Sequence, residues 1–357
     1  MKCLIITPWC NDLDLYTVKG TPENAYLFQE LTQRGIDTQV ICPETPGFPK
    51  IREVRFSFIY EHLYDRDIFR LLKNINYDFA ISITGLGSRA LKKRGKPFFV
   101  KYLGAFDFFI TGSIRRKLYH RRLYLSVKAD PLAAVMTDDG TQGEKALRKA
   151  GYKKDILFLK NGYFAELLNL DRQEEDGTIN IGFAASLELI KGVDFLIKII
   201  ETLSNSDRFR FIIAGEGTFH KKIEELAKKY PDKIEYMGYL PYLKMPEFYE
   251  KIDVLLSLNR YSNGTLPVVE AQAAGIPPIA FDIQETTKFI KHNVTGFLVE
   301  PFDIDSIVFL LRNIRKKQLR GMRKNIREFV LNTFWDMRRR AEKEVDFYTG
   351  RLNHEGS

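Results

Sequence analysis

The chain has 357 residues, of which 45% are hydrophobic and 28% are charged. These ordinary values exclude a disordered chain, a collagen-like fibre and a multi-span membrane protein, and no run approaches the ~18 apolar residues of a membrane-spanning helix. At ~150 residues per domain, the length predicts about two domains. The formal net charge of +9 favours a polyanionic partner, or it serves solubility alone.

The first half of the chain alternates short apolar runs with longer helical patterns. The apolar runs do not alternate with polar residues, which is typical of strands buried on both faces in a parallel sheet. We expect strands at 2–7, 37–42, 78–83, 97–102 and 132–136, and helices at 22–34, 66–75, 114–128 and 140–150. This order predicts βαβ units and a doubly wound sheet.

The same pattern restarts after the polar stretch 171–177. We expect strands at 178–185, 209–214, 233–237, 253–258 and 276–281, and helices at 191–203, 218–229, 244–251, 267–274, 284–291 and 334–352. The predicted fold class is therefore α/β, with two Rossmann-like halves in tandem and a ligand cleft between them.

Cysteine and histidine patterns give little sign of metal or disulfide chemistry. Three cysteines without paired spacing argue against a disulfide framework, and no Cys/His spacing matches a zinc site. The triplet Asp12-Leu13-Asp14 resembles a metal-binding motif, but we interpret it as a loop. We expect no metal and no cofactor.

The segment 254–280 is the most informative part of the sequence. An apolar strand precedes an Asn-Gly turn, and a helix with proline at its first position follows, where proline is tolerated. The N–H groups of Thr265 and Leu266 at that helix start suit a diphosphate. Glu270, one turn inside, can accept hydrogen bonds from a ribose. A plain strand-turn-helix unit with a surface glutamate explains the same pattern equally well.

Two further pieces favour an anionic ligand in the second half. Lys191 stands at an expected helix start, where a cation opposes the helix dipole unless an anion is close. Gly215 and Gly217 follow an expected strand, and glycine there lets the backbone approach a ligand closely. A solvated lysine and ordinary turn glycines are the alternatives.

Several short motifs together resemble a retaining glycosyltransferase of family 4, the glycosyl transferases group 1. Their order and spacing match over most of the chain. The matching pieces are 18–22 (the glycine loop after the first strand), 33–37 ("RGH"), 160–162 ("NG"), 191–194 ("KGVD"), 215–217 ("GdG"), 268–275 ("LEAMAxG"), 295–299 ("TGxLV") and 334–335 ("FSW").

The resemblance implies a B-type glycosyltransferase fold, with two facing Rossmann-like domains and a deep interdomain cleft. It places an acceptor-binding domain at 1–165, a nucleotide-sugar-binding domain at 166–333 and a C-terminal helix at 334–357 that packs back on the first domain. It implies Lys191 and Glu270 as catalytic residues, and a UDP- or GDP-linked sugar as substrate. The donor-binding residues that it implies are Gly20, Ser186, Lys191, Gly215, Gly217, Ser262, Asn263, Gly264, Thr265, Leu266 and Glu270.

The chain departs from the family pattern at three positions. Ser262 stands where the family has the first glutamate of a Glu-x7-Glu pair, Ser186 where it has an arginine, and Leu103 where it has a donor-facing histidine. The main hypothesis is a transferase that moves a sugar to a glycan or lipid-linked acceptor hydroxyl. The departures keep two alternatives open: a non-catalytic nucleotide- or glycan-binding relative, or a sugar-nucleotide epimerase on the same fold.

A basic, aromatic stretch at 106–124 suits an anionic membrane face. Its cations, which we also assign to an acceptor or membrane surface, are Arg115, Arg116, Lys117, Arg121 and Arg122. A solvated helix is the alternative, and we expect no nucleic-acid partner because no such motif is present. The N-terminus is too weakly apolar for a signal peptide. We therefore expect a cytoplasmic protein, with peripheral binding at the inner face of the plasma membrane.

Overall fold

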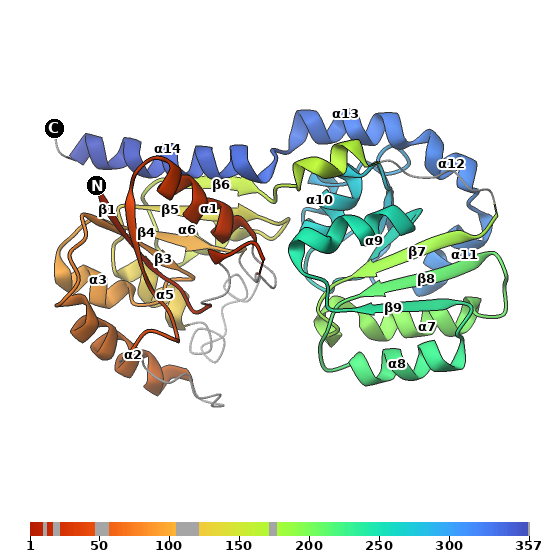
Figure 1. Cartoon of the computed structure of the whole chain (residues 1–357), viewed down its shortest axis with the longest axis horizontal. Coiled ribbons are helices and arrows are strands. Elements are labelled where there is room, and N and C mark those ends of the chain that lie inside the picture. Colours follow the sequence, from red (N-terminus) through yellow and green to blue (C-terminus); the bar gives the residue numbers. More distant parts are fainter. Residues whose placement is uncertain (10–12, 17–21, 47–56, 105–120, 171–176, 356–357) are drawn as a thin grey trace. The chain divides into compact units, whose positions relative to one another are not determined.

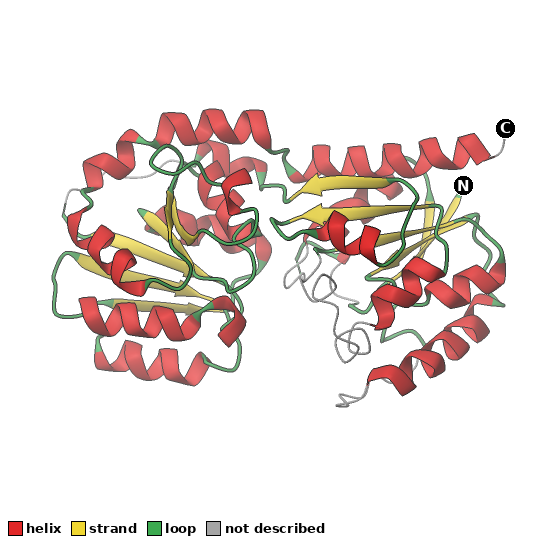
Figure 2. Ribbon diagram, turned by 180° about the vertical axis from the view of Figure 1, so that it is seen from behind, coloured by secondary structure: helices red, strands yellow, loops and turns green. Residues whose placement is uncertain are grey.

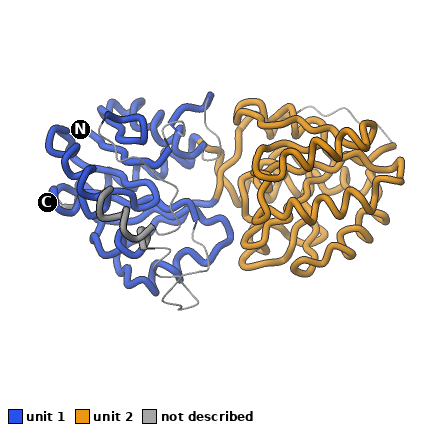
Figure 3. Tube along the Cα trace, turned by 90° about the horizontal axis from the view of Figure 1, so that it is seen from below, with its two compact units in different colours: residues 1–160, 338–357 blue, residues 161–337 orange. Residues whose placement is uncertain are grey.

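The computed structural model describes residues 1–9, 13–16, 22–46, 57–104, 121–170 and 177–355. The chain divides into two compact units, which Figure 3 shows in different colours. Unit 1 comprises residues 1–160 and 338–357, and unit 2 comprises residues 161–337. These limits lie five and four residues from the boundaries expected after 165 and 333.

Unit 1 is built on a parallel sheet of six described strands in the order β2-β1-β3-β4-β5-β6. The expected parallel arrangement is confirmed, and β6 is a strand that the sequence analysis did not assign. The strands are β1 (Lys2–Ile6), β2 (Asp37–Ile41), β3 (Phe79–Ile83), β4 (Phe98–Tyr102), β5 (Ala133–Asp138) and β6 (Ile156–Lys160).

Helices cover both faces of this sheet, as Figure 2 shows from behind. One face packs against α1 and the C-terminal helix α14, whose Val345 and Tyr348 enter the core. The other face packs against α2, α3, α5 and α6. The bounds are α1 (Pro22–Gln33), α2 (Ser57–Leu72), α3 (Ser88–Arg94), α5 (Arg121–Lys128), α6 (Gly143–Lys149) and α14 (Met337–Glu355).

A buried ion pair fixes α14 to the sheet of unit 1. The Lys101 ammonium at the end of β4 donates to Glu344 Oε2 at 3.0 Å, and both side chains are fully buried. Glu344 also accepts from Arg340 and from the Tyr348 hydroxyl, so its two oxygens bind three donors. Burial lowers the pKa of Lys101, and the charge of Glu344 opposes that effect. The C-terminal helix is therefore part of the first unit's core.

Unit 2 contains a second parallel sheet of six described strands, in the order β12-β11-β10-β7-β8-β9. The strands are β7 (Ile179–Ala184), β8 (Phe209–Ala214), β9 (Ile234–Gly238), β10 (Val254–Ser257), β11 (Pro278–Phe281) and β12 (Phe297–Val299). In Figure 1, α7 (Val193–Leu203) and α8 (His220–Lys229) lie on one face, while α9 (Met245–Lys251) and α10 (Leu266–Ala273) lie on the other.

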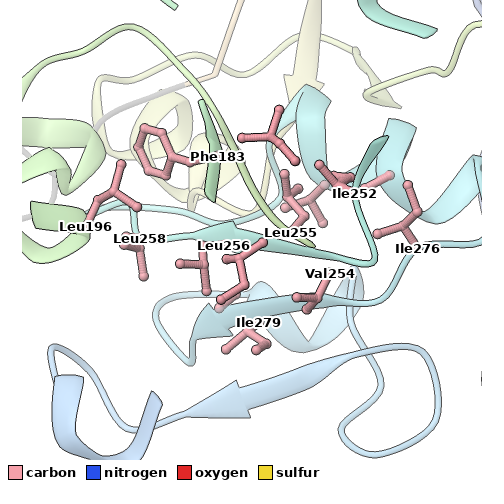
Figure 4. Packing of buried hydrophobic residues seen from close by; sticks show 14 of the residues in the cluster. Phe183, Leu196, Ile252, Val254, Leu255, Leu256, Leu258, Ile276 and Ile279 are labelled. Atoms are coloured by element: carbon pink, nitrogen blue, oxygen red, sulfur yellow. The ribbon is translucent and has the colours of Figure 1, made fainter. Parts of the chain in front are cut away.

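The centre of unit 2 is a continuous apolar core, because its middle strands are hydrophobic on both faces. Figure 4 shows side chains from β7, β10 and β11 around this centre, among them Phe183, Leu255 and Ile279. Gly182 lies inside this packing, since a Cβ there would come within 2.5 Å of the Ile252 side chain.

The strand order of unit 2 reverses between β7 and β10. The chain runs outward from β7 to β9 and then returns to the other side of β7 as β10. Pairing between these two strands ends at Gly182 and Leu255, two residues before the end of each strand, whereas β7 pairs with β8 along all six residues. Ligands of doubly wound sheets bind at the carboxyl ends of strands at such a reversal. The loops after β7 and β10 are therefore the place to look for a site.

Two parts of the sequence analysis need correction in unit 2. The expected helix at 284–291 is a single 3₁₀ turn at Thr286–Lys288, where two β-branched threonines and the left-handed backbone of Gln284 (φ 54°) oppose a longer helix. The sequence analysis also left the region after β12 unassigned. It forms α11 (Ile304–Asn313), α12 (Lys316–Gly321) and α13 (Arg323–Thr333).

Cysteine chemistry departs from the expectation at one position. Cys42, just after β2, is disulfide-bonded, whereas Cys3 in β1 is a buried free thiol. The argument from the cysteine count is therefore wrong at Cys42. Among the described residues, no helix is long and apolar enough to cross a bilayer.

Candidate active site

Helix α10 begins at the end of the loop that follows β10. Thr265 is the N-cap residue, and Pro267 lies in the first turn, where its missing N–H costs no helical bond. The N–H groups of Val268 and Val269 donate to the Thr265 carbonyl. Within the described part of the chain, the N–H groups of Thr265 and Leu266 donate to no protein acceptor. Two open donors at the positive end of a helix suit an anion.

Asn263 anchors the loop that carries these donors. Its Oδ1 accepts from the Ser257 hydroxyl at 2.8 Å and from the Asn259 N–H at 3.3 Å. Its Nδ2 donates to the Phe281 carbonyl at 2.9 Å, so the side chain joins the ends of β10 and β11. Asn263 is fully buried. Both ends of its amide are used inside the protein, so the structure gives Asn263 a role in bracing the loop, and the donor contact stays a prediction.

Ser262 and Gly264 form the rest of the turn. The Ser262 hydroxyl accepts from the Gly264 N–H at 3.3 Å, and the Gly264 carbonyl accepts from Asn161 Nδ2 at 2.8 Å. Asn161 thus ties the start of unit 2 to the loop before α10. The serine in the family's glutamate position is largely buried and shapes the backbone of this turn.

Glu270 lies inside unit 2, with 1% of its surface exposed. Its Oε2 accepts a hydrogen bond from the Tyr249 hydroxyl on α9 at 2.9 Å. Burial raises the pKa of the fully buried Tyr249, and the negative charge of Glu270 raises it further. Glu270 is therefore not the surface glutamate of the alternative interpretation. It is a buried carboxylate held by a side chain of the preceding helix, α9, one turn behind the open N–H groups.

The loop after β7 carries Ser186 and Lys191. Ser186 is exposed, and its carbonyl accepts from the Glu188 N–H at 2.8 Å. Lys191 does not open the helix, as the sequence analysis expected, but ends a 3₁₀ turn at Leu189–Lys191. Gly192 follows with φ 77° and caps α7. Only glycine fits there, because a Cβ would lie 2.1 Å from the Leu258 carbonyl oxygen. The loop after β7 is thereby pressed against the loop after β10.

Gly215 and Gly217 lie in the loop after β8, and the neighbouring loop explains both glycines. A Cβ on Gly215 would lie 1.8 Å from the Ala185 carbonyl oxygen, and one on Gly217 would lie 2.6 Å from that of Leu187. The close packing of the loop after β7 is enough to explain both glycines. That they also let the backbone approach a ligand stays a prediction. Three loops at the carboxyl edge of one sheet are packed together in this way.

Comparison with known proteins shows which family part of the chain resembles. Residues 170–330 match the model of glycosyl transferases group 1. This match lies within unit 2 and covers somewhat less than half of the chain. The chain is 28% identical to an uncharacterised 41.2 kDa protein in the cps region of Klebsiella pneumoniae, over 89% of this chain and 93% of that protein. It is 26% identical to the UDP-Gal:alpha-D-GlcNAc-diphosphoundecaprenol alpha-1,3-galactosyltransferase of Escherichia coli, over 79% of this chain and 77% of that enzyme.

Solved structures agree on the fold of this glycosyltransferase. Sucrose-phosphate synthase from Thermosynechococcus elongatus superposes with a TM-score of 0.74 at 16% identity, with both chains covered completely. Anabaena HepE in complex with UDP-glucose gives a TM-score of 0.69 at 14% identity, over 98% of this chain and all of that one. The chain therefore has the B-type glycosyltransferase fold that its motifs indicated.

The sequence analysis missed a salt bridge that joins two loops of the glycosyltransferase site. Arg260, after β10, makes two hydrogen bonds to the Asp194 carboxylate, at 2.9 and 2.8 Å. Partial burial acts to raise the pKa of Asp194, but the bonds and charge of Arg260 outweigh it and lower that pKa. The Arg260 guanidinium also lies 4.1 Å from the Phe195 ring centroid. The aspartate of the "KGVD" motif was the signal in the sequence, but nothing there indicated its partner 66 residues later.

The remaining predicted site residues belong to unit 1. Gly20, Arg115, Arg116 and Lys117 lie outside the described residues, and Arg121 and Arg122 begin α5. The sequence analysis placed Leu103-Gly104 in the position of a donor-facing histidine. A Cβ on Gly104 would come within 2.4 Å of the Asp139 carboxylate, so the end of β4 lies against the loop after β5.

Proposed function

We propose that the protein is a retaining glycosyltransferase that moves a sugar from a nucleotide-diphospho-sugar to a hydroxyl of a glycan or lipid-linked acceptor. The observation that carries this proposal is the start of α10, where Thr265 and Leu266 present two open N–H groups at a strand-order reversal. A diphosphate is the part of the donor that such a site suits. Lys191 in the adjoining loop supplies a positive charge to the same edge of the sheet.

The proposed role of these groups is to stabilise the leaving diphosphate. As the bond between sugar C1 and the diphosphate oxygen breaks, negative charge grows on that oxygen. The acceptor oxygen bonds to C1 on the same face, and its proton passes to the departing phosphate. Fixed N–H donors and a nearby ammonium act most strongly in that transition state. In this scheme the acceptor oxygen forms the new bond directly, so no protein nucleophile is required.

Glu270 and Tyr249 have a separate proposed role. Because Tyr249 holds Oε2, the carboxylate keeps a fixed direction one turn behind the phosphate-binding end of α10. From there it would accept hydrogen bonds from the ribose hydroxyls. We keep Lys191 and Glu270 as the catalytic pair, together with Ser186 and Ser262 as donor contacts.

For the donor we propose UDP rather than GDP, on the strength of the relatives. HepE was solved with UDP and with UDP-glucose, and the name of the E. coli relative specifies UDP-Gal. For the acceptor we propose a lipid-linked glycan. The E. coli relative is named for a diphosphoundecaprenol-linked acceptor, and a Staphylococcus aureus relative for poly(ribitol-phosphate). The acceptor surface would include the basic residues between Arg115 and Arg122.

The test combines a binding step with a stereochemical one. Calorimetry with UDP, GDP and ADP should give tightest binding for UDP. Turnover of a UDP-sugar panel on a lipid-linked glycan extract, followed by NMR of the product, should show the anomeric configuration of the donor. An inverted product would contradict the retaining mechanism. Nucleotide binding without turnover of any donor would contradict the transferase proposal and favour a binding protein.

A further inference from the structure

The region that follows α11 is unusually basic. Residues 312–327 contain eight lysines and arginines and no aspartate or glutamate. They span the end of α11, all of α12 and the first half of α13, which Figure 1 shows as consecutive helices of unit 2. A run of like charges on ordered helices repels itself, so it needs either a structural use or an external anion.

One of these cations has a structural use. Lys316 forms an ion pair with Asp253 at 3.1 Å and donates to the Thr178 carbonyl, both at the amino ends of strands in unit 2. The loop before α12 is also held there, because Arg208 donates to the Ile314 carbonyl at 2.9 Å. This edge of the sheet is opposite the candidate active site. Lys316 therefore holds the segment in place.

Other cations of the segment have no such use. Arg315, Lys317, Lys324 and Arg327 are exposed. Across the described residues, no carboxylate oxygen lies within 4.0 Å of their side-chain nitrogens. No ion pair with a described carboxylate therefore neutralises their charge.

Helix α13 arranges two of these cations beside exposed apolar side chains. Its inner face buries Ile326 and Val330 in the core of unit 2. Its outer face carries Lys324, Arg327 and Leu331, at helical spacings of three and four residues. Leu331 is 62% exposed.

Trp335 lies two residues beyond the end of the helix and is 37% exposed. One acid, Glu328, follows Arg327 on the exposed side. Nucleic acid and an anionic membrane are the two polyanions that such a charge attracts. Leucine and tryptophan exposed beside lysine and arginine distinguish between them, because apolar side chains gain from entering the lipid interface and tryptophan is enriched there.

We propose that the outer face of α13, with Lys324, Arg327, Leu331 and Trp335, docks unit 2 on a membrane surface rich in anionic lipids, assisted by Arg315 and Lys317. This surface is separate from the basic stretch at 115–122 in unit 1 and does not depend on the proposed reaction. It gives the donor-binding unit its own attachment to the lipid phase.

Vesicle flotation of the full chain tests the proposal. Wild-type protein should float with phosphatidylglycerol vesicles at low salt and much less with phosphatidylcholine vesicles or at high salt. The double variant Lys324→Gln/Arg327→Gln should lose roughly 30-fold in partition coefficient, since each cation near an anionic surface contributes about fivefold. Leu331→Asn should weaken the binding that remains at high salt.

A matched variant distinguishes membrane binding by this surface from a general effect of the protein's net charge. Lys221→Gln/Lys228→Gln removes two exposed lysines from α8, a helix in which two exposed acids, Glu224 and Glu225, lie among the lysines. It should keep wild-type flotation, and UDP affinity should be unchanged in both double variants. An equal loss in the α8 variant would overturn the proposal, as would wild-type protein that does not float. Binding of a random RNA that competes with vesicles and depends on the same α13 residues would assign the surface to nucleic acid instead.

Discussion

Replacement of Asn263 by alanine tests the structural interpretation of the site loop. The change removes the hydrogen bonds to Ser257, Asn259 and Phe281, and it leaves the buried Phe281 carbonyl without this donor. At about 1 kcal/mol net for each of three bonds, unit 2 should lose roughly 3 kcal/mol of unfolding free energy. Because the same loop positions the Thr265 and Leu266 donors, nucleotide affinity should fall as well.

Two measurements on one preparation check this expectation. Thermal unfolding should move the transition of unit 2, which spans 177 residues, by about 6–12 °C, at ~2–4 °C per kcal/mol for this size. Calorimetry with UDP at a temperature where the variant is folded should show weaker binding. Asn325→Ala, an exposed asparagine on α13, is the matched control and should change neither quantity.

A direct donor contact would give a different pattern. In that case Asn263→Ala would lower UDP affinity and leave the unfolding transition in place. That outcome would refute the anchoring role and restore the interpretation that the sequence alone suggested.

Three further variants test other parts of the structure. Lys191→Ala should weaken UDP binding by ~1.5–3 kcal/mol, the range for a hydrogen bond to a charged group, and unchanged calorimetric affinity would make Lys191 an ordinary surface residue. Glu270→Gln keeps an acceptor for Tyr249, so it should weaken UDP binding yet spare inorganic pyrophosphate; equal losses for both ligands would exclude a ribose contact. Glu344→Ala leaves the buried Lys101 charge without its carboxylate partner, so the free energy of unfolding measured with denaturant should fall by about 3–5 kcal/mol. A loss below about 1 kcal/mol would contradict the buried ion pair.

Most of the fold follows from local sequence signals. Largely apolar runs such as 79–83 and 211–214 are typical of strands buried on both faces, and the helical patterns between them indicate parallel connections. Two of the missed elements carry weak signals because they are short. Strand β12 has only three residues, and α12 has six, so each shows fewer than two periods of its pattern.

The site was predictable where one segment determines the geometry. The proline at the start of α10 and the turn before it place Thr265 and Leu266 at a helix end, and the structure has them there. The bracing role of Asn263 was not predictable, because a polar residue beside a site can equally bind a ligand or hold the loop, and its partners Ser257 and Phe281 lie on different strands. The Arg260–Asp194 pair joins residues from two separate loops, which no local pattern encodes.

The central claim is that the start of α10 binds the diphosphate of the donor, and amide NMR tests it most directly. In a titration of the full chain with UDP, and then with pyrophosphate, the N–H resonances of Thr265 and Leu266 should shift saturably with both ligands. The N–H of Ala274, which donates to the Glu270 carbonyl at the far end of α10, is the internal reference and should shift little. UDP binding by calorimetry with unshifted Thr265 and Leu266 amides would contradict the claim.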